Sequence, residues 1–169
     1  MEPLTIIGLA TAAILFFSGG GQLRKQVAIK LSPSQLDNID IIETEFRNAG
    51  FTVSVAAAAV VNAYAESKLN HLAKGDGGHS IGLFQLNDWG AGKGMTVEAR
   101  QDPVINTRRI IEVAQGHYGK DLREFNDAQS TDVPQITAVF CRDIERPADT
   151  NAKMNSRAAL AIKMFPNMR

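Results

Sequence analysis

The feature that most constrains the fold is a strongly apolar helical segment, residues 53–68, that ends on a carboxylate. It contains four consecutive alanines and two valines (residues 56–61), and Thr52 or Ser54 can supply the N-cap oxygen. A helix that is apolar on every side is expected at the centre of a core. Glu66 stands in its last turn, where core packing has no use for a charged group.

The position of Glu66 suits a general acid. A carboxylate is disfavoured at the negative, C-terminal end of a helix, and apolar neighbours such as Tyr64 or Leu69 would add a desolvation penalty. Both effects favour the protonated acid, which can donate its proton to a glycosidic oxygen.

A glycine-rich turn and an amide-rich segment follow. Residues 75–78, Gly-Asp-Gly-Gly, are typical of a tight chain reversal. In residues 80–87 small side chains would let a polymer approach the backbone, and the amides of Gln85 and Asn87 could bind sugars. Ser80 and His79 would lie beside them. The pattern predicts a small β-hairpin between Glu66 and Asn87, bordering a cleft.

The same residues carry a resemblance. Glu66-Ser67 followed by Gly-Leu-Phe-Gln at 82–85 is similar to a signature of goose-type lysozymes and soluble lytic transglycosylases. The fuller pattern resembles the phage tail-associated lysozyme family over roughly residues 33 to 165. Its four motifs occur in order as Ala65-Glu66-Ser67-Lys68-Leu69-Asn70, Gly75-Asp76-Gly77-Gly78, Ser80 to Gln85, and Glu145-Arg146-Pro147-Ala148.

The resemblance implies a lysozyme-like α+β fold, mostly α, and cleavage of the β-1,4 bond between N-acetylmuramic acid and N-acetylglucosamine, with Glu66 as the acid. The sequence leaves the second catalytic carboxylate unassigned. Asp76 is the candidate by position, as a base or nucleophile, but an aspartate before glycine is equally common as a pure turn residue. In that case the muramic acid C6 hydroxyl attacks instead, which is lytic transglycosylation. The transglycosylases' third motif, of the Ala-Tyr-Asn-Ala-Gly type, is missing, which favours a lysozyme.

Other side chains have simpler interpretations. Glu145 and Arg146 are expected to form a structural ion pair beside Pro147. Trp89 and Tyr118 could stack on sugar rings, although lone aromatic residues are more often partly buried.

Composition bounds the remaining possibilities. A chain of 169 residues with 44% hydrophobic content can bury one substantial core, so we expect one catalytic domain, residues 24–169. A formal net charge of zero gives little support to nucleic-acid binding. Cys141 lies in an apolar run and is interpreted as a buried structural thiol. His71, His79 and His117 lack ligand spacing, so neither a metal nor another cofactor is expected.

The N-terminal segment, residues 1–23, is the second unusual feature. Residues 3–23 carry no charge, and an apolar helix is expected there. Residues 4–22 are long enough to reach a membrane-spanning length, whereas Glu2 and a weak cleavage site argue against a signal peptide. We expect a membrane anchor or a buried hydrophobic arm.

Cap residues predict the remaining helices. We expect helices that begin at Ser32-Pro33, Asp102-Pro103, Asp132-Val133-Pro134 and Asp149 or Thr150, with ends near Asn48-Ala49-Gly50, at Gly116 or Gly119, and at Arg146-Pro147.

Basic residues after the apolar segment would keep the domain in the cytoplasm, away from peptidoglycan. A virion-associated phage enzyme avoids this conflict, because the particle delivers it to the wall at infection. We therefore expect an enzyme of host entry that contacts peptidoglycan glycan strands and other virion proteins. A bacterial membrane enzyme, an endolysin and a non-catalytic virion protein are the alternatives.

Overall fold

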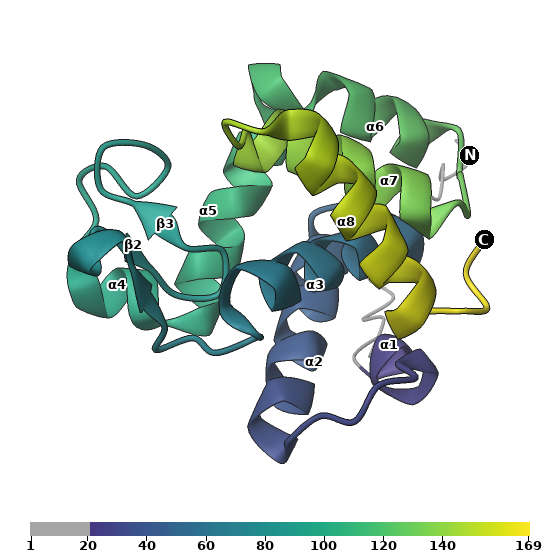
Figure 1. Ribbon diagram of the computed structural model, residues 1–169, viewed down its shortest axis with the longest axis horizontal. Helices are drawn as coiled ribbons and strands as arrows, with labels where there is room; N and C mark the ends of the chain where they lie inside the picture. Colours follow the sequence, from purple (N-terminus) through teal and green to yellow (C-terminus); the bar gives the residue numbers. More distant parts are fainter. Residues whose placement is uncertain (1–20) are drawn as a thin grey trace, which may run out of the picture.

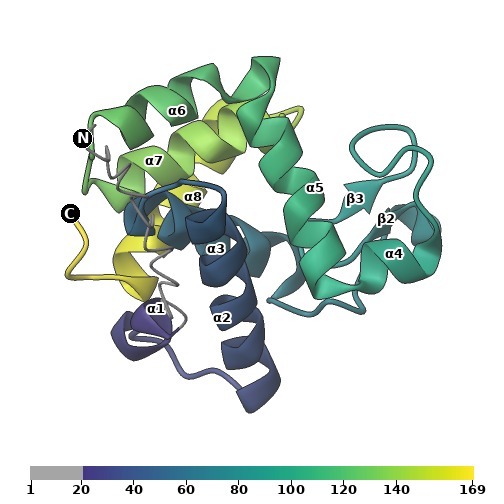
Figure 2. The same ribbon diagram turned by 180° about the vertical axis from the view of Figure 1, so that it is seen from behind.

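The computed structural model describes residues 21–169, which form a mostly helical α+β protein with one small antiparallel sheet. The sheet and α4 form a lobe beside a larger helical body, as both views show (Figure 1 and Figure 2). The elements are α1 (Gln22–Gln26), α2 (Pro33–Asn48), α3 (Val53–Ser67), β1 (Lys74–Gly75), η1 (Asp76–Gly78), β2 (Ser80–Ile81), β3 (Leu86–Asn87), α4 (Val97–Gln101), α5 (Pro103–Gln115), η2 (His117–Gly119), α6 (Lys120–Asp127), α7 (Val133–Phe140), η3 (Cys141–Glu145) and α8 (Thr150–Met164).

Helix α3 is the centre of the core, as its sequence predicts. Its residues from Val55 to Ala63 are completely buried, and α2, α7 and α8 pack against it. The alanines make this close packing feasible, since small side chains let the neighbouring helices approach. Thr52 caps the helix by accepting a hydrogen bond from the Val55 N–H at 3.3 Å.

Most of the other helices begin and end where their caps predict. Helix α2 starts with a capping box in which Ser32 and Gln35 bond each other's backbone N–H groups. Helices α5, α7 and α8 are capped by Asp102, Asp132 and Asp149. The short helices α4 and α6 have no counterpart among the predicted elements, and the helix predicted to end at Arg146-Pro147 finishes with the wide, π-helical turn η3.

The predicted hairpin is a three-stranded antiparallel sheet in the order β1-β2-β3. Lys74 pairs with Ile81 across the first turn, and Ile81 pairs with Leu86 across the second. Each strand has only two residues, so the lobe depends on contacts to its neighbours. Asn106 of α5 supplies several of these by donating to the carbonyls of Ile81 and Arg100 and accepting from the Phe84 N–H.

The predicted N-terminal apolar helix lies outside the described residues, except for its last three positions. There Leu23, in α1, is completely buried in the main core, and its N–H donates to Glu43 Oε2 at 2.9 Å. Burial raises the pKa of the Glu43 carboxyl group, and the backbone donors Leu23 and Gly21 oppose that rise. Within residues 21–169, none of the helices combines the length and apolar character that a membrane crossing requires.

Candidate active site

Glu66 lies at the end of α3 that faces the sheet lobe. The helix stops there because Lys68 and Leu69 adopt left-handed conformations, with φ of 56° and 57°. Ser67 is buried and donates to the carbonyls of Ala63, at 3.0 Å, and Leu83, at 2.8 Å. This second bond ties the end of α3 to the turn between β2 and β3, so the Glu66 backbone is fixed against the lobe.

A cleft of about 310 Å³ opens between the sheet lobe and η3. Residues from α3, the sheet, α5 and η3 contribute to its walls, so the cleft depends on the tertiary fold. The lining residues are Glu66, Phe84, Gln85, Leu86, Asn87, Gly90, Ala91, Ile110, Ile144, Glu145 and Arg146.

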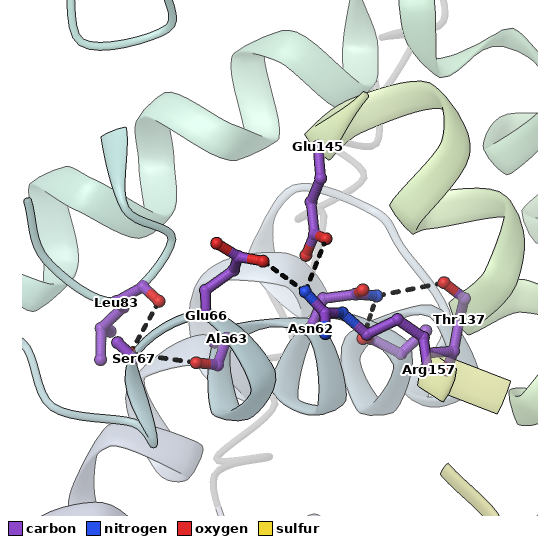
Figure 3. A network of polar contacts seen from close by, with 9 residues as sticks. Asn62, Ala63, Glu66, Ser67, Leu83, Thr137, Glu145 and Arg157 are labelled. Atoms are coloured by element: carbon purple, nitrogen blue, oxygen red, sulfur yellow. Dashed lines mark hydrogen bonds and ion pairs between the residues drawn. The ribbon is translucent and has the colours of Figure 1, made fainter. Parts of the chain in front are cut away.

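Arg157 of α8 connects the two carboxylates of the cleft. Its Nη2 donates to Glu66 Oε1 and, at 3.2 Å, to Glu145 Oε2 (Figure 3). The Arg157 side chain is only 7% exposed, and that of Glu145 is 11% exposed, whereas Glu66 retains 28% exposure. Of the two acids, Glu66 is therefore the more accessible to a ligand in the cleft.

The buried end of this cluster has unusual electrostatics. Burial raises the pKa of Glu145 to about 7, because desolvation and the nearby Glu66 charge outweigh the opposing effect of Arg157. Glu145 Oε1 and Arg157 Nε are buried and have no hydrogen-bond partner among the described residues. Cys141, one helical turn before Glu145, is buried as predicted, and burial raises the pKa of its thiol to about 12.

Two of the predicted sugar-binding residues, Gln85 and Asn87, line the cleft together with Glu66. The Gln85 amide also donates to the carbonyls of Gly82, at 2.9 Å, and Ala73, at 3.3 Å. It is thus both a wall residue of the cleft and a support for the loop backbone.

Asp76, Ser80 and His79 do not line the cleft. Asp76 is exposed in the turn between β1 and β2, has a positive φ of 49°, and accepts a hydrogen bond from Ser80 Oγ. Ser80 Oγ in turn accepts from Asn87 Nδ2 at 3.2 Å, so a chain of hydrogen bonds links the turn to the cleft wall. His79 contacts Asp88, with 3.1 Å between Nδ1 and Oδ2.

Sequence reasoning missed three residues of the candidate site: Arg157, Glu145 and Arg146. The predicted ion pair between Glu145 and Arg146 is wrong, because Glu145 pairs with Arg157. Arg146 instead lines the cleft and places its guanidinium 4.3 Å from the centre of the Tyr118 ring. The Glu-Arg-Pro-Ala motif did mark this wall, whereas Arg157 lies 91 residues from Glu66 and has no local sequence signal.

Among residues 21–169, no three His, Cys, Asp or Glu side chains are arranged to hold a metal ion. The polar cluster at this end of the cleft consists of a partly exposed carboxyl group, a buried second carboxyl group and the guanidinium between them.

A partly exposed glutamate at the end of a buried helix, facing a small sheet across a cleft, defines a mostly helical α+β protein with a carboxyl-based site. A family model described as phage tail lysozyme matches residues 37–168, so the chain belongs to the phage tail lysozyme family. Membership indicates lytic activity on peptidoglycan by a glycosidase associated with the phage particle. The comparison with curated proteins gives no match.

Proposed function

We propose that the protein is a muramidase that cleaves the β-1,4 bond between N-acetylmuramic acid and N-acetylglucosamine, with Glu66 as the general acid. The observation that carries the proposal is the placement of Glu66. Its carboxyl group keeps access to a cleft that the amides of Gln85 and Asn87 also line. A proton donor and amide hydrogen-bonding groups that face one cleft suit the hydrolysis of an amino-sugar polymer.

Lytic transglycosylation is the second candidate, and the position of Asp76 favours it. Hydrolysis by two carboxyl groups requires them to be about 5 to 9.5 Å apart on either side of the scissile bond. Asp76 is exposed, is engaged by Ser80 and is absent from the cleft wall, which supports a turn role. Among the described residues, the only other carboxyl group that lines the cleft is Glu145, which is paired with Arg157. In a transglycosylase the muramic acid C6 hydroxyl would attack instead and leave 1,6-anhydro ends.

We also propose that the enzyme acts during host entry as part of the virion. The support is the family, whose description refers to the phage tail. A tail-borne enzyme reaches the wall from outside the cell, so it needs no export by the host. A lysozyme-like tail protein that has lost catalysis is the alternative.

The test is mass spectrometry of the muropeptides that the full-length chain releases from purified peptidoglycan. Reducing muramic acid ends would identify a muramidase, and anhydro ends a transglycosylase. Glu66→Gln should abolish release, whereas Glu124→Gln, on an exposed face of α6, should retain it. Release that survives in Glu66→Gln would overturn the assignment of the acid, and no release by the wild type would favour the non-catalytic alternative.

Asp76→Asn distinguishes the two reactions further, because the amide keeps a polar turn residue and removes only the charge. Loss of activity with intact folding would support Asp76 as the second carboxylate of a hydrolase. Retained activity would assign Asp76 to the turn.

A further inference from the structure

Trp89 is the most exposed of the large hydrophobic residues in the described chain. Its side chain lies in the loop between β3 and α4, and 72% of the residue is accessible to solvent. An indole ring exposed to this extent gives up most of the free energy that its burial would contribute to folding. Its ring is stacked on a neighbour and its backbone is hydrogen-bonded, which distinguishes it from a flexible surface side chain.

One face of the indole ring is covered and the other is open. The His79 ring stacks on it with 4.3 Å between ring centroids and an interplanar angle of 29°. Asp88 holds His79 through its contact with Nδ1 at 3.1 Å. The histidine therefore supports the tryptophan from behind, which leaves a flat aromatic surface directed to solvent.

The backbone that carries Trp89 is tightly held. Asn87 Oδ1 accepts from the Trp89 N–H at 2.9 Å, and the Asn87 carbonyl accepts from the N–H groups of Gly90 and Gly92. Arg109 of α5 donates to the Ala91 carbonyl at 2.6 Å. A ligand that stacks on Trp89 would consequently lose little free energy in ordering the loop.

The loop is continuous with the cleft. Asn87, two residues before Trp89, and Gly90 and Ala91, directly after it, all line the same cleft as Glu66. A polymer bound beside Glu66 that continues along this wall would reach the tryptophan.

We propose that Trp89 is a stacking platform for a hexosamine ring of the glycan strand, at a subsite beyond the cleft that contains Glu66. The apolar C–H face of a pyranose ring would pack on the open face of the indole, and the cleft amides would bind the neighbouring units. This inference rests on the proposed action on glycan strands. It also assigns His79 a supporting role, in which it orients the tryptophan.

The single tryptophan of the chain makes the platform directly observable. Glu66→Gln protein, which should bind without turnover, is titrated with chitin oligosaccharides and with peptide-free glycan strands while tryptophan emission is recorded. Isothermal calorimetry of the same mixtures measures binding independently of Trp89. We expect a saturable emission change whose midpoint agrees with the calorimetric Kd.

Substitutions then test the contribution of the ring. Trp89→Ala in the Glu66→Gln background should weaken the calorimetric Kd about tenfold, as expected for the loss of one aromatic stacking contact. Trp89→Phe should restore most of the affinity. Leu72→Ala removes another exposed apolar side chain, outside the cleft lining, and should bind like the parent.

The results distinguish a failure of the Trp89 platform proposal from a failure of the muramidase proposal. Calorimetric binding without an emission change, together with an unchanged Kd in Trp89→Ala, would refute the platform and leave the muramidase proposal intact. No binding by calorimetry and no muropeptide release by the wild type would overturn both.

Discussion

The buried Glu145 makes a specific prediction about how stability depends on pH. Its pKa rises from 4.5 to about 7 in the folded protein because its carboxyl group is desolvated. The folded state then binds this proton more tightly than the unfolded state does. The resulting stabilisation is complete below pH 4.5 and is lost as the pH rises through about 7.

The size of this effect follows from the same two values. At about 1.4 kcal/mol for each pH unit, the full loss is about 3 kcal/mol. Roughly 2 to 3 kcal/mol of it falls between pH 5 and pH 8.5. Glu145→Gln cannot ionise and keeps the shape of the protonated acid, so it should not show this loss. Relative to the wild type, Glu145→Gln should therefore gain that amount of unfolding free energy between the two pH values.

Urea unfolding of both proteins at pH 5 and pH 8.5 measures the difference. With a denaturant dependence of about 1 to 3 kcal/mol per molar urea, the relative midpoint should move by about 1 M. Glu124→Gln, an exposed counterpart, should differ little from the wild type at either pH. A Glu145→Gln effect that is equal at both pH values would refute the reasoning. A wild type that gains relative stability at pH 8.5 would show that attraction to Arg157 exceeds the cost of burial.

Three further predictions concern the lobe and the core. Asn106→Ala removes buried hydrogen bonds to three backbone groups of the lobe. The free energy of unfolding, measured in urea, should fall by on the order of 3 kcal/mol. A decrease of less than about 1 kcal/mol would show that water replaces the amide. Gly82→Ala would place a Cβ atom 2.1 Å from the Arg100 carbonyl oxygen at a φ of +87°, so the Tm should fall by roughly 5 to 10 °C, and an unchanged Tm would contradict this packing. The Cys141 thiol, buried and with its pKa raised to about 12, should resist alkylation at pH 8 in the folded protein and react fully in urea, whereas rapid labelling of folded protein would refute its burial.

The fold was predictable wherever its signals are local. Caps at Thr52, Asp102 and Asp149 mark helix starts because each side chain satisfies backbone N–H groups of its own first turn. The apolar composition of residues 56–61 indicates complete burial without reference to any partner. The glycine turn around Asp76 likewise predicts a reversal, although it does not reveal that a third strand completes the sheet.

Short elements were not predictable, because tertiary contacts determine them. Helices α4 and α6 span only five and eight residues, too few for a periodic pattern to stand out. The turn η3 widens into π-helical geometry before Arg146, which takes a left-handed conformation with φ of 54°. Pro147 correctly predicts that the helix stops there, but not the shape of its last turn.

The same distinction between local signals and tertiary contacts applies to the site residues. Glu66, Gln85 and Asn87 line the same cleft and lie in one stretch of sequence, so a motif can identify them together. Their electrostatic environment comes from elsewhere, because η3 supplies Glu145 and α8 supplies Arg157. Sequence reasoning considered Glu66 beside its helix neighbours, with a macrodipole and apolar contacts. In the folded protein it shares one guanidinium with a second acid.

The sharing of the Arg157 guanidinium by Glu66 and Glu145 affects the chemistry proposed for Glu66. One positive charge serves two carboxyl groups, and burial raises the pKa of Glu145 to about 7. When Glu145 is protonated, the whole charge of Arg157 is directed at Glu66; when it ionises, the guanidinium is divided between them. The activity of Glu66 should therefore depend on the protonation of a residue that the substrate need not touch. Glu145→Gln fixes the first of these states, so we expect an inflection near pH 7 in the wild-type pH profile of muropeptide release and none in the profile of Glu145→Gln. An identical inflection in both proteins would assign that titration to another group.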